Sequence, residues 1–123
     1  MIDHISQQVP KRDIHSEEFT EFFALFGLKE IDKDEDSPKG EEIRTELERG
    51  WMVRWFIDEN GTTFHIVGGE RPQQLRLGHV GIFDIGTERW QACRHSKWFA
   101  LESSVGNGLW LEGPCGLRVE VRP

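Results

Sequence analysis

The chain has 123 residues, of which 37% are hydrophobic and 30% charged, and its net charge at neutral pH is −7. This composition is ordinary for a soluble globular domain, and the acidic balance without a basic stripe excludes a non-specific grip on nucleic-acid phosphates. The apolar runs are too short to cross a bilayer, and the first residues lack a signal-peptide pattern. We therefore expect a cytoplasmic protein without a nucleic-acid or membrane partner, in which Cys93 and Cys115 are free thiols.

The chain begins with a predicted strand over residues 2–9, which ends at Pro10. A helix follows, because Ser16 is a suitable N-cap and Gly27 a suitable terminator. Between these two positions, phenylalanines recur with the i, i+3, i+4, i+7 spacing of one helical face. The members of this apolar stripe are Phe19, Phe22, Phe23 and Phe26.

Three more strands complete the first half. Asn60-Gly61 between two apolar runs is a strong hairpin signal, and it joins the second and third of these strands. The acidic stretch 34–49 predicts a solvated loop with one helical turn near 41–48. The three strands are predicted at residues 28–33, 51–58 and 62–68.

The second half repeats this order. A strand at 78–85 is followed by a helix at 88–95, which Thr87 is expected to cap and which turns Trp90 and Cys93 inward. Three strands are again expected after the helix. They are predicted at residues 98–104, 107–112 and 117–122.

The two halves align directly. Residues 55–66 (WFIDENGTTFHI) and 110–121 (WLEGPCGLRVEV) superpose at a constant offset of 55, which places His65 on Glu120. DHIS (3–6) superposed on GHVG (78–81) places His4 on His79. A repeat of this kind indicates a duplicated module. The sequence therefore predicts an α+β fold of two βαβββ modules, at residues 1–70 and 71–123.

The strands of both modules share a pattern of faces. Because side chains alternate along a strand, each has one apolar face, and the opposite face carries a histidine or a glutamate. A solvated sheet face is the simpler interpretation of any one such residue. Four of them at two pairs of equivalent positions favour a common site. These residues are His4, His65, His79 and Glu120.

These motifs resemble those of the vicinal oxygen chelate superfamily, which includes glyoxalases, bleomycin resistance proteins and extradiol dioxygenases. The run GPCGLRVEV (113–121) is similar to the family's D-P-x-G-x-x-x-E signature, with Gly113 in place of Asp. GHVGI (78–82) is similar to the G-H-[IV] that opens the second module, and DHIS (3–6) to the opening strand of the first. FTEFFALFGLKEI (19–31) resembles the helix that follows it.

The resemblance implies a fold and a metal site. The modules pair as a curved mixed sheet that encloses a cavity, with helices on the outer face. His4, His79 and Glu120 match the metal-ligand positions, and His65 matches a fourth position that glyoxalase I-type members fill with Glu and some epimerases with Gln. The implied cofactor is one divalent ion, and Zn, Ni, Co, Mn and Fe(II) all suit imidazole and carboxylate ligands.

The resemblance also implies a reaction class. A metal-dependent lyase or isomerase of glyoxalase type would hold two neighbouring oxygens of a small-molecule substrate. Glu120 and His65 are the candidates for the catalytic base. Residues on or near the ligand-bearing face are candidates for substrate contact. These are Arg118, Trp55, Phe83 and Trp110.

Other readings remain open. If His65 does not bind the metal, the trio that remains matches extradiol dioxygenases and fosfomycin-modifying thiol transferases. Antibiotic-sequestering resistance proteins have the same fold and bind their ligands without metal. A bare interaction domain would show an empty, solvated sheet face. The aromatic load of five Trp and eight Phe favours a homodimer.

Overall fold

The computed structural model describes residues 4–70, 80–102 and 107–123, without the side chains of His4 and Phe99. The chain divides into two compact units, residues 1–74 and 75–123. The module boundary expected after residue 70 adjoins residues 71–79, which lie outside the described part of the chain.

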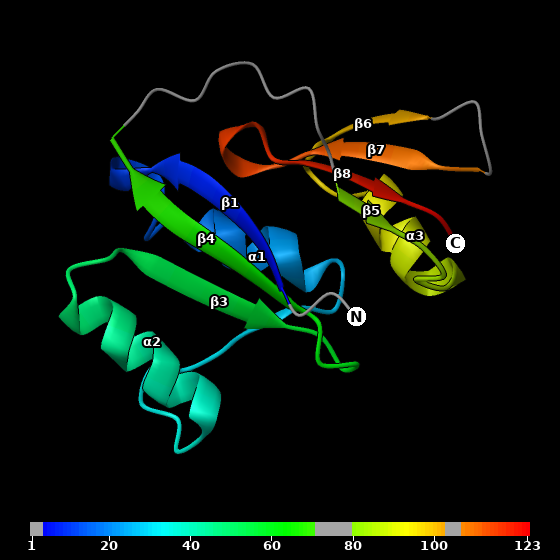
Figure 1. Cartoon of the computed structure of the whole chain (residues 1–123). Coiled ribbons are helices and arrows are strands. Elements are labelled where there is room, and N and C mark those ends of the chain that lie inside the picture. The colour runs from blue at the N-terminus through cyan, green and yellow to red at the C-terminus, as the bar shows by residue number, and fades with distance from the viewer. Residues whose placement is uncertain (1–3, 71–79, 103–106) are drawn as a thin grey trace. The chain divides into compact units, whose positions relative to one another are not determined.

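Each unit contains one four-stranded mixed sheet (Figure 1). In the first, the order is β1-β4-β3-β2, with β1 parallel to β4 and the other neighbours antiparallel. In the second, the order is β5-β8-β7-β6, with the same directions. The shared order confirms the predicted α+β fold of two βαβββ units. The strands are β1 (His4–Pro10), β2 (Lys29–Glu30), β3 (Val53–Ile57), β4 (Thr63–Gly69), β5 (Val80–Ile82), β6 (Phe99–Glu102), β7 (Leu109–Glu112) and β8 (Arg118–Val121).

The phenylalanine stripe builds the core of the first unit. A 3-10 turn, η1 (Lys11–Asp13), leads to helix α1 (Glu17–Ala24), and the Ser16 side chain caps α1 by accepting a hydrogen bond from the Glu18 amide. The Phe23 ring lies 4.5 Å from the Phe56 ring and 4.7 Å from the Phe64 ring, centroid to centroid. Because Phe56 and Phe64 pair across β3 and β4, α1 covers the sheet face that bears them.

A second helix, α2 (Pro38–Glu48), occupies most of the stretch predicted as a solvated loop with one helical turn near 41–48. The helical turn is confirmed, but the helix begins three residues earlier and the solvated loop around it is wrong. Ser37 caps it by accepting a hydrogen bond from the Gly40 amide at 3.1 Å, and Pro38 fills the first turn, where its missing N–H costs nothing. The sequence pattern hides this helix because its apolar stripe is sparse. Its one fully buried apolar side chain is Ile43, which packs with Ile31, Val53 and Trp55.

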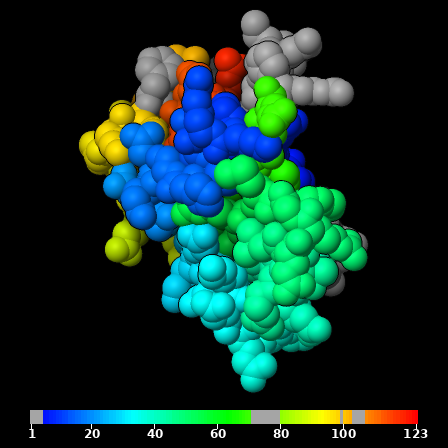
Figure 2. Space-filling view, turned by 90° about the vertical axis from the view of Figure 1, so that its left-hand side faces the viewer, coloured from blue at the N-terminus to red at the C-terminus, as the bar shows by residue number. Residues whose placement is uncertain are grey.

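The two helices of the first unit therefore cover opposite faces of its sheet (Figure 1). Trp55 and His65 are register partners on β3 and β4, and they lie on the face that α2 covers. Figure 2 shows α2 and the loop before it, cyan to green, as a broad part of the molecular surface on this side. The face of the first sheet that carries His65 is therefore closed by helix α2 over β3 and β4.

In the second unit, helix α3 (Thr87–Arg94) begins after Gly86, whose φ of 86° a side chain would disfavour. The prediction that Thr87 caps this helix is wrong, because Gly86 is the N-cap and provides no side chain. Cys93 faces inward as predicted and is fully buried. Trp90 is only half-buried, and its indole N–H donates to the Asn107 carbonyl at 3.1 Å.

Within the described residues, no helix is long and apolar enough to cross a membrane. Both cysteines are free thiols, as predicted. Burial raises the pKa of the Cys93 thiol to about 11, because the thiolate has no solvent there. Cys115 is half-buried.

A Gly40→Ala substitution tests whether α2 packs as described. A Cβ at this position would lie 2.2 Å from the Glu35 carbonyl oxygen, so we expect a loss of about 1–3 kcal/mol in the free energy of unfolding. Urea denaturation followed by circular dichroism measures it, with the exposed Glu41→Ala as the control on the same helix. A stability gain of about 0.4–1 kcal/mol, as expected for Gly→Ala at an unstrained helical position, would contradict the packing.

The two thiols should differ in reactivity. At about pH 8, roughly one thousandth of Cys93 is thiolate, so a disulfide reagent should modify Cys115 quickly and Cys93 only after denaturation. Mass spectrometry of the native protein during the reaction measures this order. Rapid modification of Cys93 before Cys115 would show that its burial is wrong.

Candidate metal site

The register of the first sheet places two candidate ligands on one face. β1 and β4 are parallel, with His4 opposite Thr63 and Ser6 opposite His65. Because alternate residues of a strand share a face, position 4 lies on the face that carries His65. The side chain of His4 is outside the described part, so the register fixes its face and nothing further.

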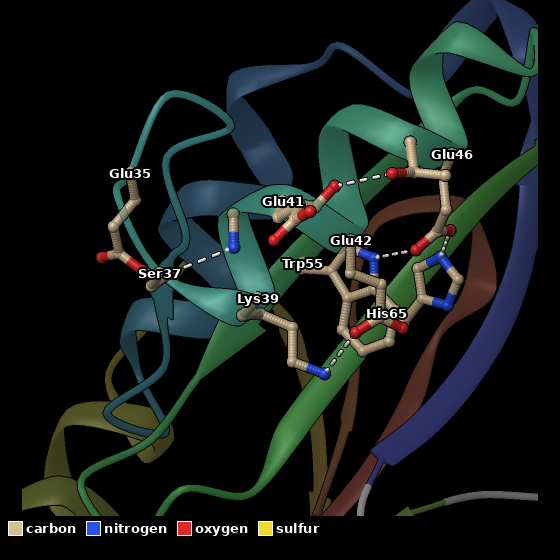
Figure 3. A network of polar contacts seen from close by, with 10 residues as sticks. Glu35, Ser37, Lys39, Glu41, Glu42, Glu46, Trp55 and His65 are labelled. Carbon is tan, nitrogen blue, oxygen red and sulfur yellow. Dashed lines mark hydrogen bonds and ion pairs between the residues drawn. The ribbon is translucent and has the colours of Figure 1, made fainter.

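His65 is held between an aromatic ring and a carboxylate (Figure 3). Its imidazole stacks on the Trp55 indole, with 4.0 Å between ring centroids and 8° between ring planes. Its Nε2 lies 3.5 Å from Oε2 of Glu46 on α2. The other oxygen of Glu46, Oε1, accepts a hydrogen bond of 3.1 Å from the Trp55 indole N–H. These three buried residues form what we call the Glu46 clamp.

The Glu46 clamp borders a groove along α2. The Lys39 side chain lies over the Trp55 ring of the clamp, with Nζ 4.4 Å from the ring centroid and 3.1 Å from the Glu42 carboxylate. The groove has a volume of about 560 Å³. Its lining residues are Pro38, Glu41, Glu42, Thr45, Glu46, Arg49, Trp51, Trp55 and His65.

Glu120 occupies the equivalent position of the second sheet. It lies on β8 opposite Gly81 of β5 and Trp110 of β7, and only 7% of its surface is exposed. The Arg122 guanidinium donates to its Oε1 at 3.3 Å. The same guanidinium lies 4.3 Å from the ring centroid of Phe83, which is half-exposed. Glu120 is therefore a buried carboxylate beside a cation and an aromatic ring.

The Gly-Pro-Cys-Gly motif sets the register of Glu120. Its turn, η2 (Pro114–Gly116), contains two successive residues of positive φ, Cys115 at 56° and Gly116 at 72°. The Gly113 amide then donates to the Leu117 carbonyl at 2.7 Å, which closes the turn between β7 and β8. The register that follows places Trp110 opposite Glu120. It is equivalent, at the offset of 55, to the pairing of Trp55 with His65 in the first sheet.

The remaining candidates lie in different surroundings. Trp55 is 2% exposed and packs as a core residue, whereas Trp110 is half-buried beside Glu120. Arg118 is exposed on β8, and Arg122 is the arginine that reaches Glu120. His79 lies outside the described residues. Among those that are described, no group of three His, Cys, Asp or Glu side chains could hold a metal ion. The metal-ligand set stays a prediction.

Sequence reasoning missed Glu46. A signal for it existed, because Ser37-Pro38 followed by Glu41 is a typical helix start, and Ile43 and Glu46 then fall three residues apart on one face. The interpretation of 34–49 as a loop with one helical turn gives Ile43 and Glu46 no helix face that could pack on the sheet.

No protein-family model matches the chain, and no curated protein matches it by sequence. Comparison with solved structures does find matches. A putative glyoxalase family protein from Bacillus anthracis has a TM-score of 0.70 at 20% identity, over 98% of this chain and 92% of that one. A possible glyoxalase from Bacillus cereus has a TM-score of 0.61 at 16% identity, over 100% and 98%.

A third match has a bound metal. It is a mutant of the fosfomycin resistance protein FosX from Listeria monocytogenes, complexed with Mn(II) and a dihydroxypropylphosphonic acid. Its TM-score is 0.60 at 17% identity, over 99% of this chain and 90% of that one. The chain has the vicinal oxygen chelate fold. At these identities the likeness establishes the fold alone.

The Glu46 clamp predicts a stability difference between two tryptophans. Trp55→Phe removes the N–H that a buried carboxylate accepts, so we expect a loss of about 1.5–3 kcal/mol in the free energy of unfolding. Trp51→Phe, at a site 52% exposed, should change it by less than about 0.5 kcal/mol. Urea denaturation followed by circular dichroism compares the two. Equal effects would contradict the buried hydrogen bond.

Proposed function

We propose that the protein is a metal-dependent enzyme of the vicinal oxygen chelate type, most closely a glyoxalase-like lyase or isomerase. The observation that carries the proposal is the buried carboxylate of Glu120 at the position equivalent to His65 in a duplicated fold. Burial of a carboxylate is costly unless a cation compensates it. One arginine at 3.3 Å supplies part of that compensation, and a divalent ion would supply more.

The residues fit such an ion by their chemistry. His4, His79 and Glu120 would hold it, and His65 would be a fourth ligand. Two or three imidazoles with one carboxylate suit Zn, Ni, Co, Mn or Fe(II). Support also comes from FosX, whose structure on this fold is complexed with Mn(II). The bound metal would act as a Lewis acid that polarises two adjacent substrate oxygens and stabilises developing negative charge.

The chain's own residues would bind and deprotonate the substrate. A Glu120 carboxylate or a His65 imidazole that is displaced from the metal would accept a proton from the carbon next to the polarised oxygen. Phe83 and Trp110 would contact the apolar part of the substrate beside Glu120. Arg118, exposed on the same strand, would attract an anionic substrate group.

Metal content tests the proposal directly. Protein purified without added metal should contain about one transition-metal ion per chain by inductively coupled plasma mass spectrometry. In His79→Ala and Glu120→Gln variants, the affinity for that ion should fall by about 100-fold or more, since loss of an outer-sphere partner alone costs 10–100-fold. Glu112→Gln is the matched control, because Glu112 is an exposed carboxylate in the same sheet, where it is the register partner of Arg118.

The opposite result has a defined meaning. Protein that contains no metal, and takes up none when Zn, Ni, Mn or Fe(II) is supplied, would exclude the enzyme and favour a metal-free antibiotic-binding protein. Equal loss of metal from Glu112→Gln and Glu120→Gln would contradict the assigned ligand.

Chelation of neighbouring oxygens has its own probe. Acetohydroxamate, which presents two adjacent oxygens to a metal, should bind the metal-loaded protein and not the metal-free protein in isothermal titration calorimetry. Equal binding to both forms would contradict a site in which the metal holds the substrate oxygens.

A further inference from the structure

The carboxylate of Glu46 is divided between two partners. Its Oε1 accepts the Trp55 indole N–H at 3.1 Å, and its Oε2 lies 3.5 Å from Nε2 of His65. The glutamate is 8% exposed, so a protein hydrogen bond and the helix that carries it fix the carboxylate in place. The Trp55 indole also fixes the plane of the His65 ring by stacking on it at 4.0 Å. The stacking therefore fixes the tilt of the imidazole, and Nε2 faces the Glu46 carboxylate at 3.5 Å without a hydrogen bond between them.

This arrangement favours one tautomer of the neutral imidazole. Nε2 either carries the proton and directs an N–H at the Glu46 oxygen, or carries a lone pair and directs it at an anionic oxygen 3.5 Å away. Two facing lone pairs repel, and the low dielectric of a buried site strengthens that repulsion. The proton therefore belongs on Nε2. A neutral imidazole has one N–H, so Nδ1 carries the lone pair.

The second nitrogen of the ring lies on the side away from Glu46 (Figure 3). The strand register places position 4, a proposed metal ligand, on the same sheet face as His65. A carboxylate that accepts the N–H of an imidazole, while the other nitrogen binds a metal, is the usual outer-sphere arrangement in metalloproteins.

We propose that Glu46 is a positioning residue that holds His65 in the Nε2–H tautomer, so that Nδ1 is its metal-binding nitrogen. The metal part of this inference rests on the proposed function. The tautomer part does not, because Glu46, Trp55 and His65 meet within the first unit. The two parts are therefore tested in sequence on the same full-length protein.

The tautomer is read first, in metal-free protein, by long-range ¹H–¹⁵N NMR of the histidine rings at about pH 8, where histidine is ordinarily neutral. Wild type should show His65 protonated on Nε2. In the isosteric Glu46→Gln variant, the amide oxygen retains the bond from Trp55 and the amide NH₂ then faces Nε2. We therefore expect the proton to move to Nδ1. The Trp55 indole signal confirms that the variant is folded.

Glu42→Gln is the matched control, because Glu42 is half-exposed on the same helix and pairs with Lys39. It should keep the wild-type tautomer. A wild-type ring protonated on Nδ1 or on both nitrogens would overturn the proposal. An unchanged tautomer in Glu46→Gln would also overturn it.

Co²⁺ titration, followed by its visible absorption spectrum, provides the second readout. Glu46→Gln should weaken Co²⁺ binding by about 10–100-fold and change the spectrum, whereas Glu42→Gln should do neither. Wild type that has the expected tautomer but binds no Co²⁺ would overturn the proposed function and the metal role of His65 with it. Unchanged Co²⁺ affinity and spectrum in Glu46→Gln would overturn the positioning role and leave His4, His79 and Glu120 as the ligands.

Discussion

The pairing of β3 with β4, and of β7 with β8, determines where the side chains of His65 and Glu120 lie. β3 pairs with β4 so that Trp55 faces His65, and β7 pairs with β8 so that Trp110 faces Glu120. A shift of one residue in either pair would move every side chain of the strand to the other face of its sheet. The Phe56–Phe64 pair opposes such a shift in the first sheet, because it would remove both rings from their contact with Phe23 on α1. In the second sheet, the buried Val119 and Val121 oppose it, because they would leave the apolar face.

The two units have used the same framework differently. In the first, α2 packs on the ligand-bearing face, buries Trp55 and brings Glu46 to His65. In the second, the equivalent face carries a half-exposed Phe83 and the Arg122 guanidinium beside Glu120. A duplicated fold thus supplies one position where a helix fixes an imidazole and one where an arginine holds a carboxylate.

The repeat and its faces were predictable from sequence because they rest on strong local signals. Asn60-Gly61 and the phenylalanine stripe each have few structural solutions, and the overlay at an offset of 55 predicts that His65 and Glu120 are equivalent. Of helix α2 only one turn near 41–48 was predicted, since most of its residues are charged or polar and its stability comes from capping by Ser37 and from burial of Ile43. The contact between Glu46 and His65 depends on that helix, so no pattern within either segment indicates it.

The proposed metal ligands are His4, His79 and Glu120, with His65 as a fourth, and paramagnetic NMR tests this proposal most directly. Mn²⁺ is added to ¹⁵N-labelled protein, and the indole N–H signals of Trp55 and Trp110 are assigned from single Trp→Phe variants. The account predicts that both signals broaden together and that the effect saturates at one ion per chain. Broadening of neither signal, or of the Trp55 signal without that of Trp110, would contradict it.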